Sequence, residues 1–210
     1  MKKLLLFCLP IILAGTINAQ TVTNKEFNLS NIQKVKTDFE YADVVFKPSK
    51  NNSLSVKATV SIAGGESNDS YVLENSTSNG TLYLKSYVKN VDDLPRTVKV
   101  KKDGQTYIFQ KSGKETYKQV RKRIKEELGV SNLDMYTEGY DIDITLEISI
   151  PARVDLEVNS NFGDLKFDKC GNKLKVECTY GSVEAIVVDA STEAEMDLLS
   201  TYSFVDVALP

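Results

Sequence analysis

Three stretches near the C-terminus repeat one pattern of hydrophobic and polar positions. They are Leu156–Leu165 (LEVNSNFGDL), Leu174–Val183 (LKVECTYGSV) and Met196–Val205 (MDLLSTYSFV). Apolar side chains occupy alternate positions in each, which indicates strands with one face turned inward. The stretches start 18 and 22 residues apart, a spacing typical of one rung of a solenoid. We therefore expect an all-β chain that folds as a single-stranded parallel β-helix (solenoid), with rungs of 18–22 residues.

If the rungs pair in register, equivalent side chains form columns, and Phe162, Tyr180 and Tyr202 share one of them. Charges at the outward positions test this register, because unlike charges on neighbouring strands favour pairing and like charges oppose it. The sign alternates in three columns, which are Asp155/Lys173/Glu195, Glu157/Lys175/Asp197 and Lys166/Glu184/Asp206. An ordinary β-sandwich with similar strands is the alternative.

Glycine follows the aromatic residue in two of the three repeats, at Gly163 and Gly181. We expect the rung to turn a corner there, where a residue without Cβ bends most easily. An earlier segment, Tyr41–Phe46, matches the same motif with Ala42 at the glycine position. The repeat is therefore expected to begin near residue 35.

A different pattern interrupts the repeats over residues 95–138. Thr97–Phe109 predicts a β-hairpin, because Asp103-Gly104 suits a tight two-residue turn. Helical spacing follows, with Ser112 and Glu115 as a capping box and Gly129 at the far end. The predicted apolar stripe consists of Tyr117, Val120, Ile124 and Leu128.

These patterns divide the chain into four parts. Residues 1–19 carry Lys2 and Lys3, an apolar run and a terminal Ala19, which together predict a secretory signal peptide with cleavage before Gln20, or alternatively after Ala14. Residues 20–94 hold looser N-terminal rungs, residues 95–138 the insertion and residues 139–210 the C-terminal rungs. Because the last strand ends without a polar cap, we expect the C-terminal part to be truncated or covered by a partner.

Export would place the two remaining cysteines, Cys170 and Cys178, in an oxidising space that permits a disulfide. Cys178 shares its column with Ser160 and Ser200, however, and so resembles a small inward-facing residue. We favour a buried thiol and a loop thiol over the disulfide.

Several classes of catalytic site are excluded by composition. The chain has no histidine, which removes Ser-His-Asp and Cys-His nucleophilic sites and the commonest zinc ligand. It has no glycine-rich phosphate loop, so no cofactor is expected. Paired carboxylates remain, Asp43 with Asp164 and Asp141 with Asp143, and turn-stabilising roles are favoured over catalysis or calcium binding for them.

Charge is the strongest local anomaly. Loss of the signal peptide lowers the net charge from −3 to −5, yet residues 96–125 hold eleven basic and two acidic residues. On the predicted helix, Lys114, Lys118, Arg121, Lys122 and Lys125 lie away from the apolar stripe. This cationic face could bind an anionic glycan, another envelope component or a protein partner. The alternative is a solvated face balanced by acids elsewhere in the chain.

Phe162-Gly-Asp-Leu, Tyr180-Gly-Ser-Val and the preceding Ile148-Ser-Ile-Pro-Ala, together with the export signal, resemble exported β-strand-repeat proteins of Gram-negative bacteria. These proteins are of unknown function and are labelled "putative adhesin". The resemblance is best over residues 35–60 and 140–210. It implies a single-stranded β-helix fold and a periplasmic, cell-surface or extracellular location, with no catalytic residues to carry over.

The sequence as a whole favours an exported, non-enzymatic binding or scaffolding module of the adhesin type. It predicts neither a nucleic-acid binder nor a membrane-spanning protein. A polysaccharide-active β-helix enzyme and a periplasmic sensing or regulatory partner are the alternatives.

Overall fold

The computed structural model describes residues 19–111, 115–131, 135–170, 173–187, 196–202 and 204–208. This part of the chain is predominantly β-strand, with one α-helix. The predicted signal peptide lies outside the described residues, apart from Ala19. No helix of the described part is long and apolar enough to cross a membrane.

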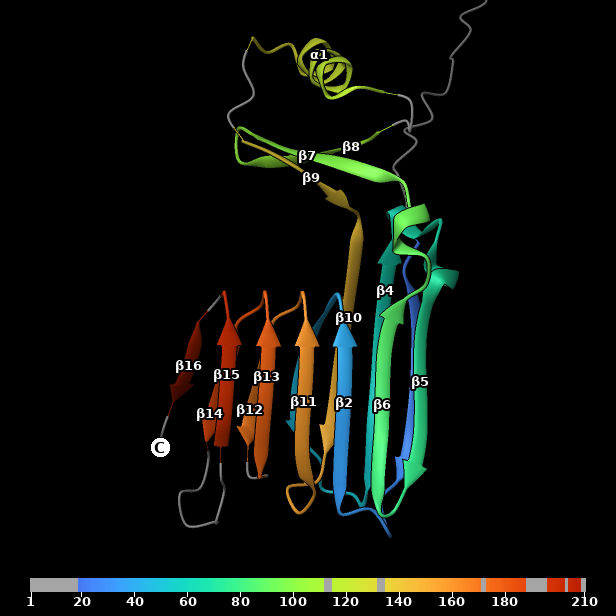
Figure 1. The fold of residues 1–210 in the computed structure, drawn as a ribbon, viewed down its shortest axis with the longest axis vertical. Helices are drawn as coiled ribbons and strands as arrows, with labels where there is room; N and C mark the ends of the chain where they lie inside the picture. Colours follow the sequence, from blue (N-terminus) through green and yellow to red (C-terminus); the bar gives the residue numbers. More distant parts are fainter. Residues whose placement is uncertain are drawn as a thin grey trace, which may run out of the picture.

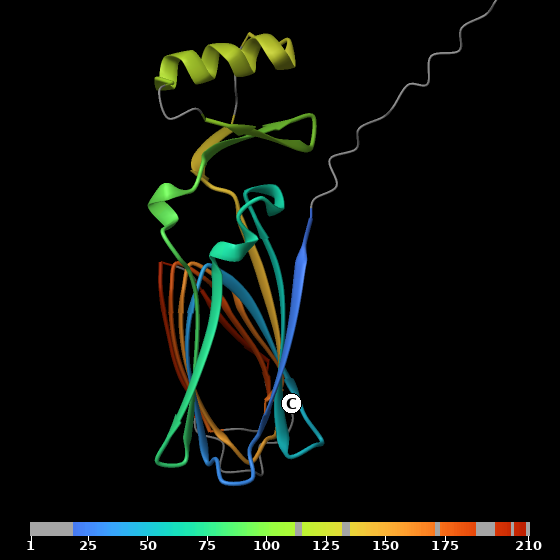
Figure 2. The same cartoon turned by 90° about the vertical axis from the view of Figure 1, so that its right-hand side faces the viewer.

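Two sheets face each other and enclose the main core (Figures 1 and 2). The seven-stranded sheet has the order β1-β4-β10-β3-β12-β14-β16, and its strands are β1 Thr21–Asn28, β3 Ala42–Pro48, β4 Ser53–Ile62, β10 Ile142–Ile150, β12 Leu165–Cys170, β14 Val183–Val187 and β16 Val205–Ala208. The six-stranded sheet has the order β15-β13-β11-β2-β6-β5, and its strands are β2 Lys34–Glu40, β5 Tyr71–Ser78, β6 Thr81–Val88, β11 Asp155–Asn161, β13 Leu174–Thr179 and β15 Met196–Thr201.

The predicted register of the C-terminal repeats is confirmed. In the six-stranded sheet Leu156 pairs with Leu174, and Leu174 pairs with Met196, in parallel strands. In the seven-stranded sheet Leu165 pairs with Val183 in the same way. The segment that was expected to begin the repeat contributes one strand to each sheet. Strand β2 pairs with β11 and strand β3 pairs with β12, also in parallel.

The expectation of one parallel β-helix throughout is not confirmed, because both sheets are mixed. Strand β4 runs antiparallel to β1 and β10, and β5 runs antiparallel to β6. The turn between β5 and β6 explains why these two strands are antiparallel and not parallel. Asn79 and Gly80 in this turn both have positive φ, 49° and 71°. Asn-Gly with this geometry forms the tight turn of a hairpin, which forces the two strands to be antiparallel.

Strand β10 joins the two kinds of pairing, because it lies between antiparallel β4 and parallel β3. Its alternate residues Ile144, Leu146, Ile148 and Ile150 are all buried, as their period of two predicts. The lead-in before β2 also contributes, with Leu29 and Ile32 buried in the main core. It continues from β1, which is an edge strand.

The structure explains the glycines at positions 163 and 181 differently from the predicted bend at a corner. Neither Gly163 nor Gly181 has a positive φ, whereas the aromatic residue before each one does. A Cβ on Gly163 would lie 2.0 Å from the carbonyl oxygen of Ala42, and one on Gly181 would lie 2.0 Å from that of Gly163. Glycine is therefore required because neighbouring backbones approach too closely for a side chain.

A second, smaller core lies in the insertion. Strands β7 Arg96–Lys102, β8 Gln105–Gln110 and β9 Met135–Tyr140 form an antiparallel sheet of order β8-β7-β9, as the hairpin prediction requires for β7 and β8. Val98 and Val100 of β7 bury against Val120 and Ile124 of α1 Tyr117–Leu128. Three short 3-10 turns, η1 Ala63–Gly65, η2 Asn68–Ser70 and η3 Val91–Asp93, complete the described elements.

The capping box at the start of α1 differs from the predicted one. Thr116 is the N-cap, and its side chain and that of Gln119 form the reciprocal box instead of Ser112 and Glu115. Ser112 lies outside the described residues, while Glu115 forms an ion pair with Arg123 at 3.0 Å. Gly129 ends the helix with φ of 63°, as predicted.

Cys178 is a buried free thiol whose Sγ lies 3.5 Å from the carbonyl oxygen of Gly163. Burial raises the pKa of this thiol. The favoured buried thiol is therefore confirmed for Cys178. The side chain of Cys170 lies outside the described residues.

Candidate binding surfaces

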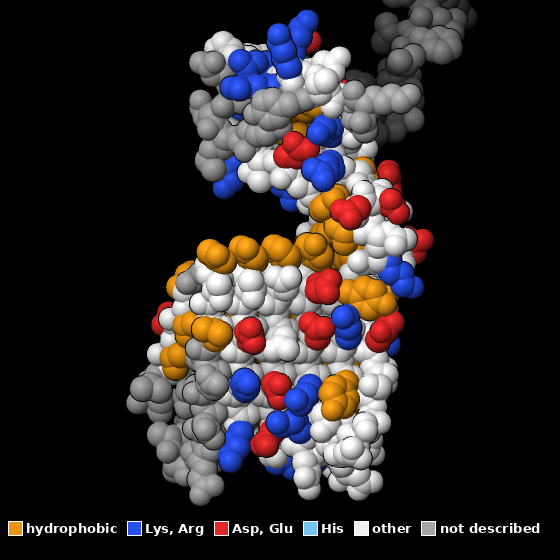
Figure 3. Space-filling view, in the orientation of Figure 1, with side chains coloured by type: hydrophobic (Ala, Val, Ile, Leu, Met, Phe, Trp, Pro, Cys, Tyr) orange, Lys and Arg blue, Asp and Glu red, His pale blue; other side chains and the backbone are white. Residues whose placement is uncertain are grey.

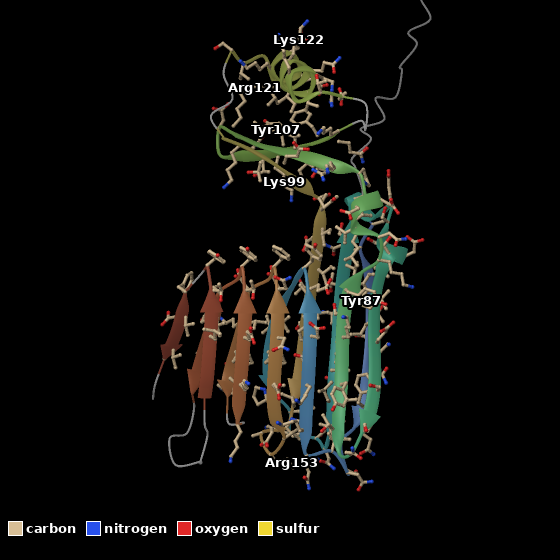
Figure 4. The ribbon with its side chains drawn as sticks, viewed as in Figure 1. Tyr87, Lys99, Tyr107, Arg121, Lys122 and Arg153 are labelled. Carbon is tan, nitrogen blue, oxygen red and sulfur yellow. The ribbon has the colours of Figure 1, made fainter. Side chains whose placement is uncertain are left out.

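The exposed face of α1 carries the predicted cationic surface. The helix buries Val120 and Ile124 against β7 and turns Lys118, Arg121 and Lys122 to solvent. Lysine and arginine side chains gather over this end of the molecule (Figure 3), and Lys122 points away from the three-stranded sheet (Figure 4). Lys114 lies outside the described residues.

Four of the predicted basic residues line one hollow of about 500 Å³. They are Lys118, Arg121, Lys122 and Lys125, and the hollow also contacts Glu126, Val130 and Ser131. We call this set of four basic residues the basic helix surface. A hollow of this size is within the range of small-molecule sites, and it is large enough for part of a polymer chain.

Other basic residues of the insertion hold it together. Arg123 pairs with Glu115 at 3.0 Å, and Lys111 pairs with Glu138 at 2.8 Å. Lys102 donates a hydrogen bond of 2.8 Å to the carbonyl oxygen of Leu128. Further ion pairs join Arg96 to Glu138, Lys99 to Asp141 and Arg123 to Glu127.

The basic helix surface is much less neutralised. Lys122 has a long, exposed ion pair of 3.8 Å with Glu126, and Lys125 donates to the carbonyl oxygen of Ser131. Lys118 and Arg121 have no ion pair with any residue that the structure describes. Exposed charges of one sign attract an oppositely charged polymer and lose that attraction in high salt.

A ladder of aromatic rings forms a second exposed feature. Tyr41, Phe162, Tyr180 and Tyr202 stack in one row, with centroids 5.2, 5.1 and 5.0 Å apart and interplanar angles of 8° or less. This confirms the predicted shared column of Phe162, Tyr180 and Tyr202. In Figure 3 a row of hydrophobic side chains follows the ends of β2, β11, β13 and β15, below the three-stranded sheet.

The alternation of apolar positions places Phe162, Tyr180 and Tyr202 on the inward face of their strands, and this expectation is wrong. Phe162, Tyr180 and Tyr202 are 45%, 52% and 79% exposed. All four ladder residues have φ between 57° and 62°, which ends the alternation of the strand and turns the side chain outward. Neighbouring rings cover both faces of Phe162 and Tyr180, so these two rings present their edges to solvent, while Tyr41 and Tyr202 at the ends each stack on one side. Sequence alternation alone could not reveal this, because it assumes extended backbone at every position.

The paired carboxylates Asp43 and Asp164 link neighbouring rungs of the parallel strands. Asp43 Oδ1 accepts a hydrogen bond of 2.9 Å from the backbone N–H of Asp164. Asp164 Oδ1 in turn accepts from the N–H and the hydroxyl of Ser182, at 2.8 and 2.7 Å. Each bond joins two neighbouring rungs, whereas the favoured turn-stabilising role would require a bond within one turn. Of the other pair, Asp141 is engaged by Lys99 at 3.4 Å. Within the described ranges, no group of three or more His, Cys, Asp or Glu residues is arranged to hold a metal ion.

A third feature, which the sequence did not reveal, is a polar hollow of about 500 Å³ on the outer face of the six-stranded sheet. It contains Tyr83, which is 41% exposed, among charged and amide side chains from β2, β5, β6 and β11. The alternation of these strands predicts which residues face outward. It does not show that residues from four strands surround one depression.

Comparison with protein-family models finds no match, and comparison with curated proteins finds none either. Among solved structures, the chain is similar to a "putative cell adhesion protein" from Clostridium sporogenes, with a TM-score of 0.49 and 8% identity over 91% of this chain and 100% of that one. It is also similar to a "putative adhesin" from Bacteroides fragilis, with a TM-score of 0.32 and 7% identity over 91% of this chain and 78% of that one.

A "putative lipid binding protein" from Parabacteroides distasonis is similar with a TM-score of 0.37 and 15% identity. That similarity covers 90% of this chain and 59% of the other. Identities of this size establish no family, so membership of the adhesin-labelled family stays a prediction.

Proposed function

We propose that this chain is an exported, non-enzymatic binding module of the adhesin type, which contacts an anionic component of the cell envelope through the basic helix surface. The observation that carries the proposal is the gathering of Lys118, Arg121, Lys122 and Lys125 around one exposed hollow. An acidic polysaccharide is the ligand class that this surface fits best, because a repeated negative charge can engage several cations at once.

In this proposal the facing sheets serve as the scaffold. We interpret their parallel part, from β2 and β3 through β15 and β16, as a short β-solenoid closed at one side by antiparallel strands. The register of like residues supports this interpretation. The scaffold carries the basic helix surface through the insertion, since α1 packs on β7 and β9 continues into β10.

The alternative of a polysaccharide-active enzyme is disfavoured by the carboxylates. Asp43 and Asp164 each accept a backbone hydrogen bond from the neighbouring rung, whereas a glycosidase needs two carboxyl groups that flank one scissile bond. A periplasmic sensing partner would use the same basic helix surface, with an acidic protein as its ligand.

The proposal is tested by equilibrium binding of the chain without residues 1–19 to immobilised polygalacturonate. Lys118→Gln, Arg121→Gln and Lys122→Gln together remove three charges while keeping good helix formers. We expect this triple variant to bind at least about tenfold more weakly, and the binding of the original chain to decline steeply as salt rises.

A matched control changes net charge by the same amount elsewhere. Lys50, Lys89 and Lys169 are exposed residues of other surfaces, and replacing all three by Gln should leave the affinity nearly unchanged. Equal losses in the two triple variants would contradict a specific role for α1, since net charge alone would then explain the binding.

A further inference from the structure

The outer face of the six-stranded sheet holds a hollow that the proposed function does not use. In this sheet, the pairing of the strands places Tyr83 of β6 opposite Lys36 of β2, and Lys36 opposite Glu157 of β11. The next outward row places Lys85 opposite Asp38 and Asp38 opposite Asn159. The two rows, with Asn75 and Ser76 of β5, surround a hollow of about 500 Å³.

Four of the five charged side chains that line this hollow form ion pairs with one another, and the fifth, Glu74, accepts a hydrogen bond from Tyr87. Lys36 pairs with Glu157 at 3.0 Å, and Lys85 pairs with Asp38 at 3.2 Å. The hydrogen bond with Glu157 raises the pKa of Lys36, and the same contact lowers the pKa of Glu157, so both groups are charged at neutral pH. Basic and acidic side chains are accordingly interleaved over β2, β6 and β11 in Figure 3. An ionic ligand would have to displace these pairs, whereas a neutral ligand with hydroxyl groups can bridge them.

Tyr83 supplies an apolar platform in the same hollow. Its neighbour on the same face, Tyr87, is already engaged: its hydroxyl donates to Glu74 at 2.9 Å and Lys85 Nζ lies 5.6 Å from its ring centre. For Tyr83, by contrast, the described residues provide no hydrogen bond or ring contact. An exposed aromatic ring beside fixed polar groups offers apolar contact and orientation together.

We propose that this hollow is a binding site for a neutral oligosaccharide. A pyranose ring presents an apolar C–H face, which packs on the ring of Tyr83. Its hydroxyls donate to the carboxylates of Asp38 and Glu157 and exchange hydrogen bonds with the amide of Asn159. The site lies on paired strands, which fix its backbone, and two ion pairs hold four of its side chains before the ligand arrives.

The proposal is tested by NMR titration of the 15N-labelled chain without residues 1–19, using four neutral probes: cellohexaose, maltohexaose, mannohexaose and a β-1,4-galactan hexamer. At least one probe should shift the amide signals around Tyr83, Lys36 and Asn159. Tyr83→Ala should weaken its binding about tenfold, and Tyr83→Phe should keep it within about twofold. Tyr107→Ala, a tyrosine change on β8 of the three-stranded sheet (Figure 4), should have no effect.

A second variant guards against loss of folding in Tyr83→Ala. Asn159 is exposed, so Asn159→Ala should keep the fold and weaken binding about fivefold through its lost hydrogen bonds. The proposal is overturned if none of the four probes shifts these signals at millimolar concentration, or if both variants bind as the original chain does. The triple glutamine variant of α1 should bind the neutral probe normally, so this test is independent of the proposed function.

Discussion

Gly163 and Gly181 show how tightly the parallel strands approach at the end of each rung. The backbone carbonyl of the neighbouring rung occupies the place of a side chain, 2.0 Å from where a Cβ would lie. The preceding aromatic residues take up positive φ, a conformation that costs a bulky residue free energy. Stacking of neighbouring rings, about 0.5–1.5 kcal/mol for each pair, offsets part of that cost.

Replacing Gly181 by Ala should therefore reduce the free energy of unfolding by about 3 kcal/mol, because the strands must separate to admit a methyl group. Gly139 on β9 is the matched control, since nothing lies within 4 Å of a Cβ there. Gly139→Ala should change the stability by no more than about 0.5 kcal/mol in the same urea titration. Equal effects of the two changes would show that the close approach is not what requires glycine.

At the residue scale, the sequence predicted which side chains stack on one another better than it predicted which side chains face solvent. The shared column of Phe162, Tyr180 and Tyr202 followed from the repeat length, because register depends only on counting. The exposure of these rings depends on positive φ, and an aromatic residue in the sequence does not indicate that conformation. Asn79-Gly80, by contrast, is a recognisable turn signal that the prediction of parallel rungs left unused.

At the scale of the elements, Glu147 links three strands of the seven-stranded sheet. From β10 it accepts bonds from Lys47 of β3 at 2.7 Å and from Lys57 of β4 at 2.8 Å. It therefore ties a parallel neighbour and an antiparallel neighbour to the strand between them. The two hydrogen bonds lower the pKa of Glu147 to about 2.

This lowered pKa predicts a pH dependence of stability. Because the pKa is lower in the folded than in the unfolded chain, the two ion pairs stabilise the fold above about pH 4.5 and lose that effect as the pH falls toward 2. Glu147→Gln should lower the free energy of unfolding by no more than about 1 kcal/mol at neutral pH, since all three side chains are partly exposed.

Urea titrations of this variant at about pH 7 and about pH 3 should show the difference from the original chain shrinking at the lower pH. Glu66→Gln changes an exposed carboxylate with no ion pair to any described residue, and it should show no such trend. A difference that stays constant between the two pH values would contradict the assigned role of Glu147.

At the scale of the whole molecule, the two binding proposals use surfaces on different elements. The basic helix surface lies on α1, and the hollow around Tyr83 lies on β2, β5, β6 and β11. The sequence predicted the first, because eleven basic residues in a thirty-residue window are visible without coordinates. It could not predict the second, because β5, β6, β2 and β11 come together only through long-range pairing.

Retention on bacterial envelope fractions tests the central proposal most directly. The chain without residues 1–19 is mixed with isolated envelopes, sedimented and quantified beside the triple glutamine variants of α1 and of the control surface. The account predicts that the original chain and the control variant sediment with the envelopes while the α1 variant stays in solution. Sedimentation of the α1 variant to the same extent as the original chain would contradict the account.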